Sequence, residues 1–141
     1  MDVPPGFRHL QRSSPLLDLV GPLYSRGEGA ELVLGLRIAP KHCNSLGRVH
    51  GGIFATLADA AMGFATAFSA TPTSVMVTAN LSLDFAGGAG IGDWLEAHVS
   101  VQKHGQRLAF ANCYISTGDE RIVRASAVFL VTGALDPGPP P

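Results

Sequence analysis

The sequence is poor in charged and in aromatic side chains. Charged residues make up 15% of the 141 residues and aromatic residues 7%, and ten Lys and Arg against eleven Asp and Glu leave a formal charge of −1. A chain without excess cations lacks the field that holds a nucleic-acid backbone, so we exclude nucleic acid as a ligand. Soluble domains average about 25% charged residues, compared with 15% here, and 46% of this chain is hydrophobic. We therefore expect part of its surface to contact a partner subunit.

Cysteine is scarce as well, and the opening residues do not have the pattern expected of an export signal. Cys43 and Cys113 lie seventy positions apart, which fits neither the CxxC spacing of a zinc site nor a secreted disulfide framework. The opening MDVPPGFRHLQR has prolines and basic residues where a secretory signal has an unbroken apolar run. We expect reduced thiols and a cytoplasmic location.

One long hydrophobic run is present. Residues 51–70, GGIFATLADAAMGFATAFSA, have the length of a membrane-spanning helix and carry a single charge, Asp59. Small side chains and the cost of an acid near the middle of a bilayer favour a helix buried in a soluble protein instead. No membrane association is expected.

The segments around this helix have the pattern of strands. Leu32, Leu34, Leu36 and Ile38 alternate with residues of the opposite face, as in a strand with one buried side. We predict strands at 22–26, 32–38, 74–85, 94–103, 107–117 and 121–131, and short helical turns at 7–12 and 16–20. A helix this apolar must be covered. The order predicts an α+β fold in which one long central helix is wrapped by a curved antiparallel sheet of five to six strands, the hotdog arrangement.

Proline sets the expected limits of the domain. Prolines occur in the first six residues and in DPGPPP from Asp136, and proline cannot continue a helix or a sheet ladder. We expect a single domain over residues 13–132, a loosely ordered segment at 1–12 and a flexible Pro-rich tail at 133–141.

Candidate chemistry lies at the start and in the middle of the predicted helix. Asp59 is an ionisable carboxylate in an apolar helix, where burial makes a carboxylate more basic, as suits a base or a nucleophile. A structural bond to a hydroxyl is the alternative. Gly51 and Gly52 open the helix, where unpaired N–H groups attract a developing oxyanion. A plain helix start explains the glycines equally well.

Two polar residues precede the helix. Asn44 has an amide that orients a water or a carbonyl, or else caps a turn in its loop, and the residue alone favours the turn. His50 is a candidate general base, although a histidine before a helix is more often structural. His9, His42, His98 and His104 show no metal-ligand spacing, so no metal is expected.

A predicted hairpin tip carries two cations. Lys103 and Arg107 flank His104, Gly105 and Gln106, and further cations, Lys41 and Arg48, lie in the loop before the helix. A phosphate group would bind such a tip, and a solvated tip is the alternative.

The stretch GRVHGGIFATLADAAMGFA, residues 47–65, resembles the signature of the PaaI-like acyl-CoA thioesterases of the hotdog superfamily. The specific part runs from Asn44 to Asp59, and weaker similarity covers about Leu16 to Val131, including KHGQRLAFA at 103–111. The resemblance implies hydrolysis of acyl-CoA, with Asp59 as nucleophile or as general base on water. It also implies that the Gly51 N–H polarises the thioester carbonyl, that Asn44 positions water or substrate and that His50 shapes the turn.

The resemblance also implies how the substrate and the subunits are arranged. It assigns residues of the predicted hairpin to the coenzyme A moiety, namely Lys103, His104, Gly105, Gln106, Arg107 and Leu108. It assigns Met76 and Thr78, on the predicted strand that follows the helix, to substrate binding. Members are dimers or tetramers without metal or redox cofactor, so we expect a homo-oligomer with a catalytic dimer and no cofactor. Some relatives have hydroxyl residues, which position water, where this chain has Met76 and Gly63. In this chain Ser74 or Thr78 is the possible substitute for such a hydroxyl.

Helix geometry supports a shared site. Asp59 is eight residues past Gly51, a rise of about 12 Å, so one thioester carbon cannot lie near both in one chain. Antiparallel helices about a two-fold axis would bring Asp59 of one chain to the Gly51 end of the other. We expect an aromatic or medium-length acyl group, given Phe54, Phe64 and Phe85. The competing functions are a hotdog enoyl-CoA hydratase or dehydratase, with His50 and Asp59 as the pair, and a non-catalytic acyl-CoA binding domain.

Overall fold

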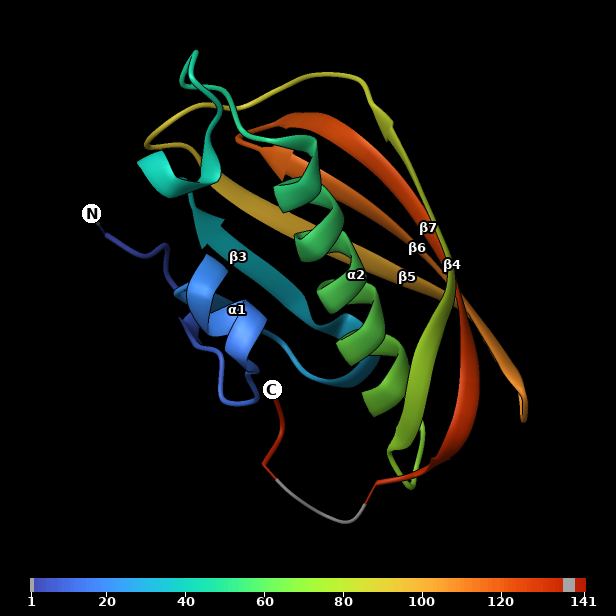
Figure 1. Ribbon diagram of the computed structural model, residues 1–141. Coiled ribbons are helices and arrows are strands. Elements are labelled where there is room, and N and C mark those ends of the chain that lie inside the picture. The colour runs from blue at the N-terminus through green and yellow to red at the C-terminus, as the bar shows by residue number, and fades with distance from the viewer. Residues whose placement is uncertain (1, 136–138) are drawn as a thin grey trace.

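The long apolar run forms helix α2 (Gly51–Phe68), which lies along the inner side of one curved sheet (Figure 1). The computed structural model describes residues 2–135 and 139–141. The strands are β1 (Arg8–His9), β2 (Leu23–Arg26), β3 (Val33–Arg37), β4 (Ser74–Phe85), β5 (Trp94–His104), β6 (Leu108–Thr117) and β7 (Glu120–Ala134). The shorter helical elements are α1 (Pro15–Val20), η1 (Gly29–Glu31) and η2 (Pro40–His42).

All neighbouring strands are antiparallel, in the order β1-β2-β3-β5-β6-β7-β4. Strand β4 is therefore an edge strand although it is 12 residues long. Its outer edge presents backbone groups that no other described strand pairs. The predicted α+β hotdog architecture is confirmed, and the sheet has seven strands rather than five to six.

The core lies between α2 and the inner face of the sheet. The helix buries Phe54, Leu57, Ala58, Ala61, Met62, Ala65 and Thr66, which recur every three to four residues. Beneath it the sheet presents mostly alanine, namely Ala97, Ala109, Ala111, Ala125 and Ala127, each at most 3% exposed. These short side chains let the helix lie close to the strands. By length and composition α2 could cross a bilayer, yet here it is the core helix of the sheet.

The N-terminal segment is where the sequence prediction was wrong. Residues 7–12 were expected to form a helical turn, but Arg8–His9 is a strand that pairs with β2. The physical reason is Phe7, whose ring packs edge-on against Trp94 with centroids 5.1 Å apart. Gly35 of β3 makes room for this contact, since a Cβ there would lie 2.2 Å from the Trp94 ring. The segment assigned to residues 1–12 thus contains a strand.

At the other end β7 continues to Ala134, two residues beyond the predicted domain limit of 132. Of the predicted Pro-rich tail, residues 136–138 lie outside the described residues. The carbonyl of Pro139 accepts a hydrogen bond from Arg12, and that of Pro141 accepts from Arg8 and Ser25. The last residues therefore contact the N-terminal strands.

A bulge in β4 decides which of its side chains face the helix. Thr78 pairs with Phe129 and Asn80 with Val128, so Ala79 is an extra residue in the strand. A bulge reverses the alternation of side chains. Thr78 before the bulge bonds Asp59 of α2, and Leu81 after it packs against the core.

Candidate active site

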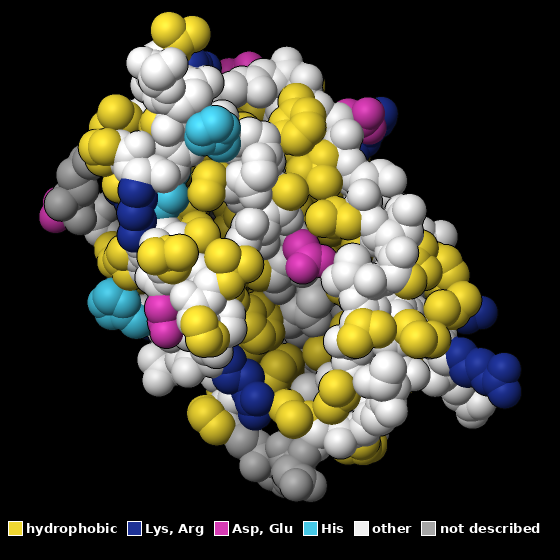
Figure 2. Space-filling view, in the orientation of Figure 1, with side chains coloured by type: hydrophobic (Ala, Val, Ile, Leu, Met, Phe, Trp, Pro, Cys, Tyr) yellow, Lys and Arg dark blue, Asp and Glu magenta, His cyan; other side chains and the backbone are white. Residues whose placement is uncertain are grey.

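A cavity of about 430 Å³ runs along one side of α2. It lies between this helix, the N-terminal segment with α1, and the first half of β4. Its lining is Arg12, Ser14, Leu16, Leu17, Thr56, Asp59, Ala60, Gly63, Phe64, Ala67, Phe68, Thr73, Ser74, Val75, Met76, Thr78, Phe129 and Leu135. Figure 2 shows mainly hydrophobic side chains on the face that carries α2, with few charged groups among them.

Asp59 is the one carboxylate in the lining of this cavity. The side chain is half-buried, and Thr78 Oγ1 donates a hydrogen bond of 2.7 Å to Asp59 Oδ1. No cation forms an ion pair with Asp59 within residues 2–135 and 139–141. One carboxylate oxygen is thus held by a hydroxyl, and the other is left to accept a proton. Of the two hydroxyls considered as substitutes, Thr78 makes this contact, whereas Ser74 bonds His104.

The N-terminus of α2 presents unpaired backbone donors. In the part of the chain that the structure describes, neither Gly51 nor Gly52 donates its N–H to another group. Both glycines are exposed, and a Cβ on Gly51 would meet the Phe85 ring at 3.4 Å. His50 is the N-cap residue, and its exposed side chain makes no capping bond. The groups at this helix end that can bind a substrate oxygen are therefore the backbone N–H groups.

Asn44 closes the loop that leads to this helix end. Its Oδ1 accepts hydrogen bonds from the N–H groups of Leu46 and Arg48, at 2.9 and 3.1 Å. The backbone closes the same loop, because Asn44 N–H donates to the Arg48 carbonyl. The capping role that the residue alone favoured is present. Within residues 2–135 and 139–141 the amide Nδ2 makes no hydrogen bond, so both of its hydrogens can bond a further partner.

A second histidine of this region escaped the sequence interpretation. His42 is 1% exposed, its Nδ1 accepts from the Ala39 N–H, and its Nε2 bonds the Val20 carbonyl. Its own carbonyl accepts the N–H of His50. His42 thus joins α1 to the start of α2. No sequence pattern separated it from the other histidines, because the distinction is one of burial.

The cysteines are not candidates for nucleophilic chemistry. Neither lines the cavity. Burial raises the pKa of the Cys113 thiol to about 12, so it is protonated at neutral pH.

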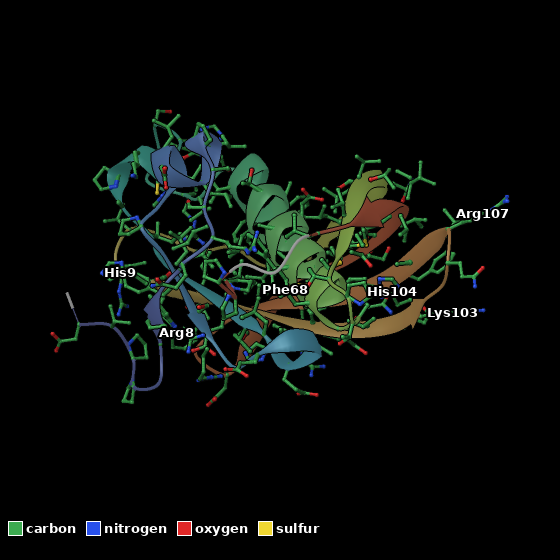
Figure 3. All side chains as sticks on the ribbon, turned by 90° about the horizontal axis from the view of Figure 1, so that it is seen from below. Arg8, His9, Phe68, Lys103, His104 and Arg107 are labelled. Carbon is green, nitrogen blue, oxygen red and sulfur yellow. The ribbon has the colours of Figure 1, made fainter. Side chains whose placement is uncertain are left out.

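The tip of the cationic hairpin does not line the cavity. Lys103 and Arg107 extend from its tip, whereas His104 turns back toward the start of β4, where its Nε2 lies 2.8 Å from Ser74 Oγ (Figure 3). None of residues 103–108 lines the cavity, but Met76 and Thr78 do. Lys41, in the loop before α2, donates hydrogen bonds to the Leu19 and Gly21 carbonyls, so its ammonium group is not free to bind a phosphate.

Within one chain the predicted catalytic residues form two groups. Asn44, His50 and Gly51 are at the start of α2 and do not line the cavity, whereas Asp59 does. Eight residues of helix separate Gly51 from Asp59, a rise of about 12 Å. Of the phenylalanines expected near the substrate, Phe64 lines the cavity, while Phe54 and Phe85 contact each other with centroids 6.1 Å apart. The sequence prediction missed Arg12, Phe68 and Phe129 in the lining.

Comparison with known proteins identifies the family. The model of the thioesterase superfamily matches residues 46–124, more than half of the chain. The chain belongs to the thioesterase superfamily. A protein of Pseudomonas aeruginosa named "Putative esterase PA0474" is 52% identical over 130 residues, which cover 92% of this chain and 97% of that protein.

Solved structures share the fold of this chain. The Escherichia coli PaaI protein from the phenylacetic acid degradation operon superimposes with a TM-score of 0.78 at 18% identity, over 86% of each chain. The smu.793 protein of Streptococcus mutans, bound to acetyl-CoA, gives a TM-score of 0.74 at 19% identity, over 79% of this chain and 90% of that one. The resemblance to PaaI-like hotdog thioesterases is confirmed, and superfamily membership supports a thioester hydrolase.

Proposed function

We propose that this thioesterase-superfamily member hydrolyses acyl-CoA, with an aromatic or medium-length acyl group bound in the cavity beside α2. The observation that carries the proposal is the Asp59–Thr78 pair, a carboxylate held by a hydroxyl in the wall of a mostly apolar cavity. The acetyl-CoA bound to the Streptococcus mutans protein supports a coenzyme A thioester as the ligand class.

The chemistry needs only a carboxylate and an oxyanion site, because a thioester carbonyl is already electrophilic. In one route Asp59 accepts a proton from water while the water oxygen bonds to the carbonyl carbon. In the other, Asp59 itself attacks, and water then hydrolyses the mixed anhydride. In both, the carbonyl oxygen gains negative charge, the C–S bond breaks and the coenzyme A thiolate leaves and takes up a proton. The Gly51 N–H stabilises the oxyanion, and Asn44 Nδ2 donates to the carbonyl or to the water.

The two routes differ in where the oxygen of water is first incorporated. A single turnover in ¹⁸O-labelled water puts the label only into the released acid if Asp59 is a general base. Nucleophilic attack, followed by attack of water on the Asp59 carbonyl of the mixed anhydride, puts an unlabelled Asp59 oxygen into the acid and leaves the label on the enzyme. Mass spectrometry of the product and of the Asp59 peptide detects this label, and its presence on Asp59 establishes the nucleophilic route.

We propose a homodimer in which each site is shared. The unpaired edge of β4 is long and carries exposed Val75, Val77 and Phe85, at 39%, 51% and 54%. Soluble proteins usually protect such an edge with charge, proline or a partner strand. Pairing β4 with its copy about a two-fold axis would set two α2 helices antiparallel, so that Gly51 of one chain approaches Asp59 of the other. A tetramer would be two such dimers.

Coenzyme A is proposed to lie along the hairpin, with Lys103 and Arg107 near its phosphates and Gln106 and Leu108 beside it. Both cations are exposed, and neither forms an ion pair with a described residue. Coenzyme A carries its negative charge at the end remote from the thioester, so cations outside the acyl cavity suit it.

A hydratase is less well supported. It would need His50 and Asp59 as a proton-transfer pair, and the exposed His50 side chain makes no capping bond that would orient its ring. Pure acyl-CoA binding without turnover would leave the Thr78-held carboxylate without a role.

The test is release of free thiol from benzoyl-, phenylacetyl-, octanoyl-, palmitoyl- and acetyl-CoA. We expect release from the saturated and aromatic thioesters, fastest with the aromatic or medium-length groups. Addition of water to an enoyl-CoA without thiol release would favour the hydratase. Strong preference for palmitoyl- or acetyl-CoA would contradict the proposed acyl class.

A further inference from the structure

The cavity beside α2 is apolar along most of its length but ends at a cation. Residues of α2 line it at every turn from Thr56 to Phe68. At the far end, Arg12, Phe68, Thr73 and Leu135 also line a second cavity of about 390 Å³, so these four residues mark the boundary between the two. The Arg12 guanidinium carbon lies 5.2 Å from the Phe68 ring centroid, a cation–π contact that sets the position of the charge.

Most of the hydrogen-bonding capacity of Arg12 is unused. Its Nε donates 2.6 Å to the Pro139 carbonyl. Within residues 2–135 and 139–141, its two terminal nitrogens make no hydrogen bond, and no carboxylate lies within ion-pair distance. A guanidinium has five N–H donors, and its terminal fork matches the two oxygens of a carboxylate. The side chain is half-buried among apolar neighbours, where such a pairing gains more than it does in open water.

We propose that the cavity selects acyl groups that carry a carboxylate at their far end, and that Arg12 binds this carboxylate. The substrate class is then the coenzyme A monothioester of a dicarboxylic acid. The inference rests on the proposed function, because it takes the thioester to lie at Asp59. It adds a specificity residue at the opposite end of the same cavity.

The distance along the helix sets the length of such a substrate. Phe68 is nine residues past Asp59, a rise of about 14 Å. A hydrogen bond to Arg12 spans about 3 Å of this distance. An extended chain advances about 1.2 Å per bond, taken from about 3.5 Å for the three bonds of one residue. The remaining length fits an acyl chain of roughly eight to ten carbons.

The anion that Arg12 binds could instead be a phosphate of coenzyme A, if the pantetheine arm rather than the acyl group filled this cavity. The two sources differ in one measurable way. A phosphate is present in every acyl-CoA, so a contact with it affects all substrates alike. A carboxylate of the acyl group is present only in dicarboxylic substrates, so its loss changes the ratio between matched substrates.

The experiment compares kcat/KM for decanoyl-CoA and for the coenzyme A monothioester of sebacic acid, which has the same ten carbons and a terminal carboxylate. We expect the wild-type protein to prefer the sebacyl thioester at least about tenfold, the scale of a charge-assisted hydrogen bond. In Arg12→Met, which retains an apolar stem, that preference should disappear. A series of six, eight, ten and twelve carbons should give the largest preference at eight to ten.

Arg8→Met is the matched control. Arg8 also bonds a tail carbonyl, that of Pro141 at 3.5 Å, but it lines neither cavity and lies away from Phe68 (Figure 3). Its substrate ratio should equal that of wild type. Thermal unfolding of both variants checks the fold, and Arg12→Gln replaces Arg12→Met if the latter does not fold.

Each outcome of this experiment either supports or overturns the inference about Arg12. A wild-type protein without preference for the sebacyl thioester overturns the inference, as does an equal loss on both substrates in Arg12→Met, which would assign Arg12 to coenzyme A. Failure of the proposed function is distinct, since then neither substrate nor any shorter acyl-CoA releases thiol, and the inference falls with it.

Discussion

The two ends of the cavity-lining helix differ in what they offer to a substrate. At the N-terminal end of α2 the chemistry is in the backbone, since Gly51 and Gly52 present unpaired N–H groups and the His50 side chain makes no capping bond. From Asp59 to Phe68 the side chains carry the chemistry, because the Asp59 carboxylate is followed by an apolar wall that ends at the Arg12 guanidinium. One end can stabilise an oxyanion and the other can supply a base.

We infer from this difference that one chain holds two half-sites rather than one site. The groups that a thioester needs lie about 12 Å apart along a rigid helix, and no rotamer change closes that distance. The unpaired β4 edge, next to both half-sites, is the feature that would join them in a dimer. The predictions that follow probe the two ends separately, from the largest expected effect to the smallest.

Asp59→Asn should lower kcat by at least about a hundredfold, because an amide can neither accept the proton nor attack. The shape is almost unchanged, and Thr78 can still donate to the remaining oxygen, so the Tm should stay within a few degrees of the wild-type value. Steady-state kinetics together with a thermal melt check both statements. A wild-type rate would remove Asp59 from the mechanism.

Asn44→Asp tests the N-terminal end. The carboxylate keeps the acceptor that closes the loop onto the Leu46 and Arg48 N–H groups, but it loses the amide donor. We expect an unchanged Tm and a loss in kcat/KM of about a hundredfold, the lower end of the cost of removing a donor to a developing oxyanion. Asn44→Ala, which loses both, should also lower the Tm. Full activity in Asn44→Asp would mean that Asn44 only stabilises its loop and does not contact the substrate.

Thr78→Val removes the hydroxyl that holds Asp59 and preserves the β-branched shape. A hydrogen bond to a charged group contributes about 1.5–3 kcal/mol, and this pair is partly exposed, so kcat should fall about tenfold. Thr78→Ser restores the hydroxyl and should recover most of the activity. Equal kinetics for the Val and Ser variants would mean that Asp59 does not depend on this contact.

His50→Ala should have the smallest effect, a change in kcat/KM below about threefold, because the exposed ring makes no capping bond. The contrast with the Asn44 variants would assign the N-terminal half-site to the backbone and the amide. A loss of a hundredfold would revive the hydratase pair of His50 and Asp59.

The sequence was sufficient for the features that have a strong local pattern. The apolar run with one acid predicted both the core helix and Asp59, and alternation predicted the main strands. Short elements that exist through distant packing were not predictable, as β1 shows: Phe7 is fixed by Trp94 across Gly35, three positions far apart in the chain.

The candidate site shows the same limit. The carboxylate, the glycines and the loop asparagine were identified from residue type and position. Which hydroxyl reaches Asp59 depends on the extra residue in β4, and a single-residue shift of register has no sequence signature here. Arg12 was missed because its segment has no periodicity, and His42 because burial alone distinguishes it from His50.

The most direct test of the shared site mixes Asp59→Asn subunits with Asn44→Ala subunits, after each variant alone has been shown to be impaired. If the half-sites come from different chains, each mixed dimer has one doubly damaged site and one intact site. Random exchange at equal amounts makes half of the dimers mixed, so about a quarter of wild-type activity per site should return. Mass spectrometry confirms the exchange. No recovery despite exchange would contradict the account and place Asp59 and Asn44 in the same chain's site.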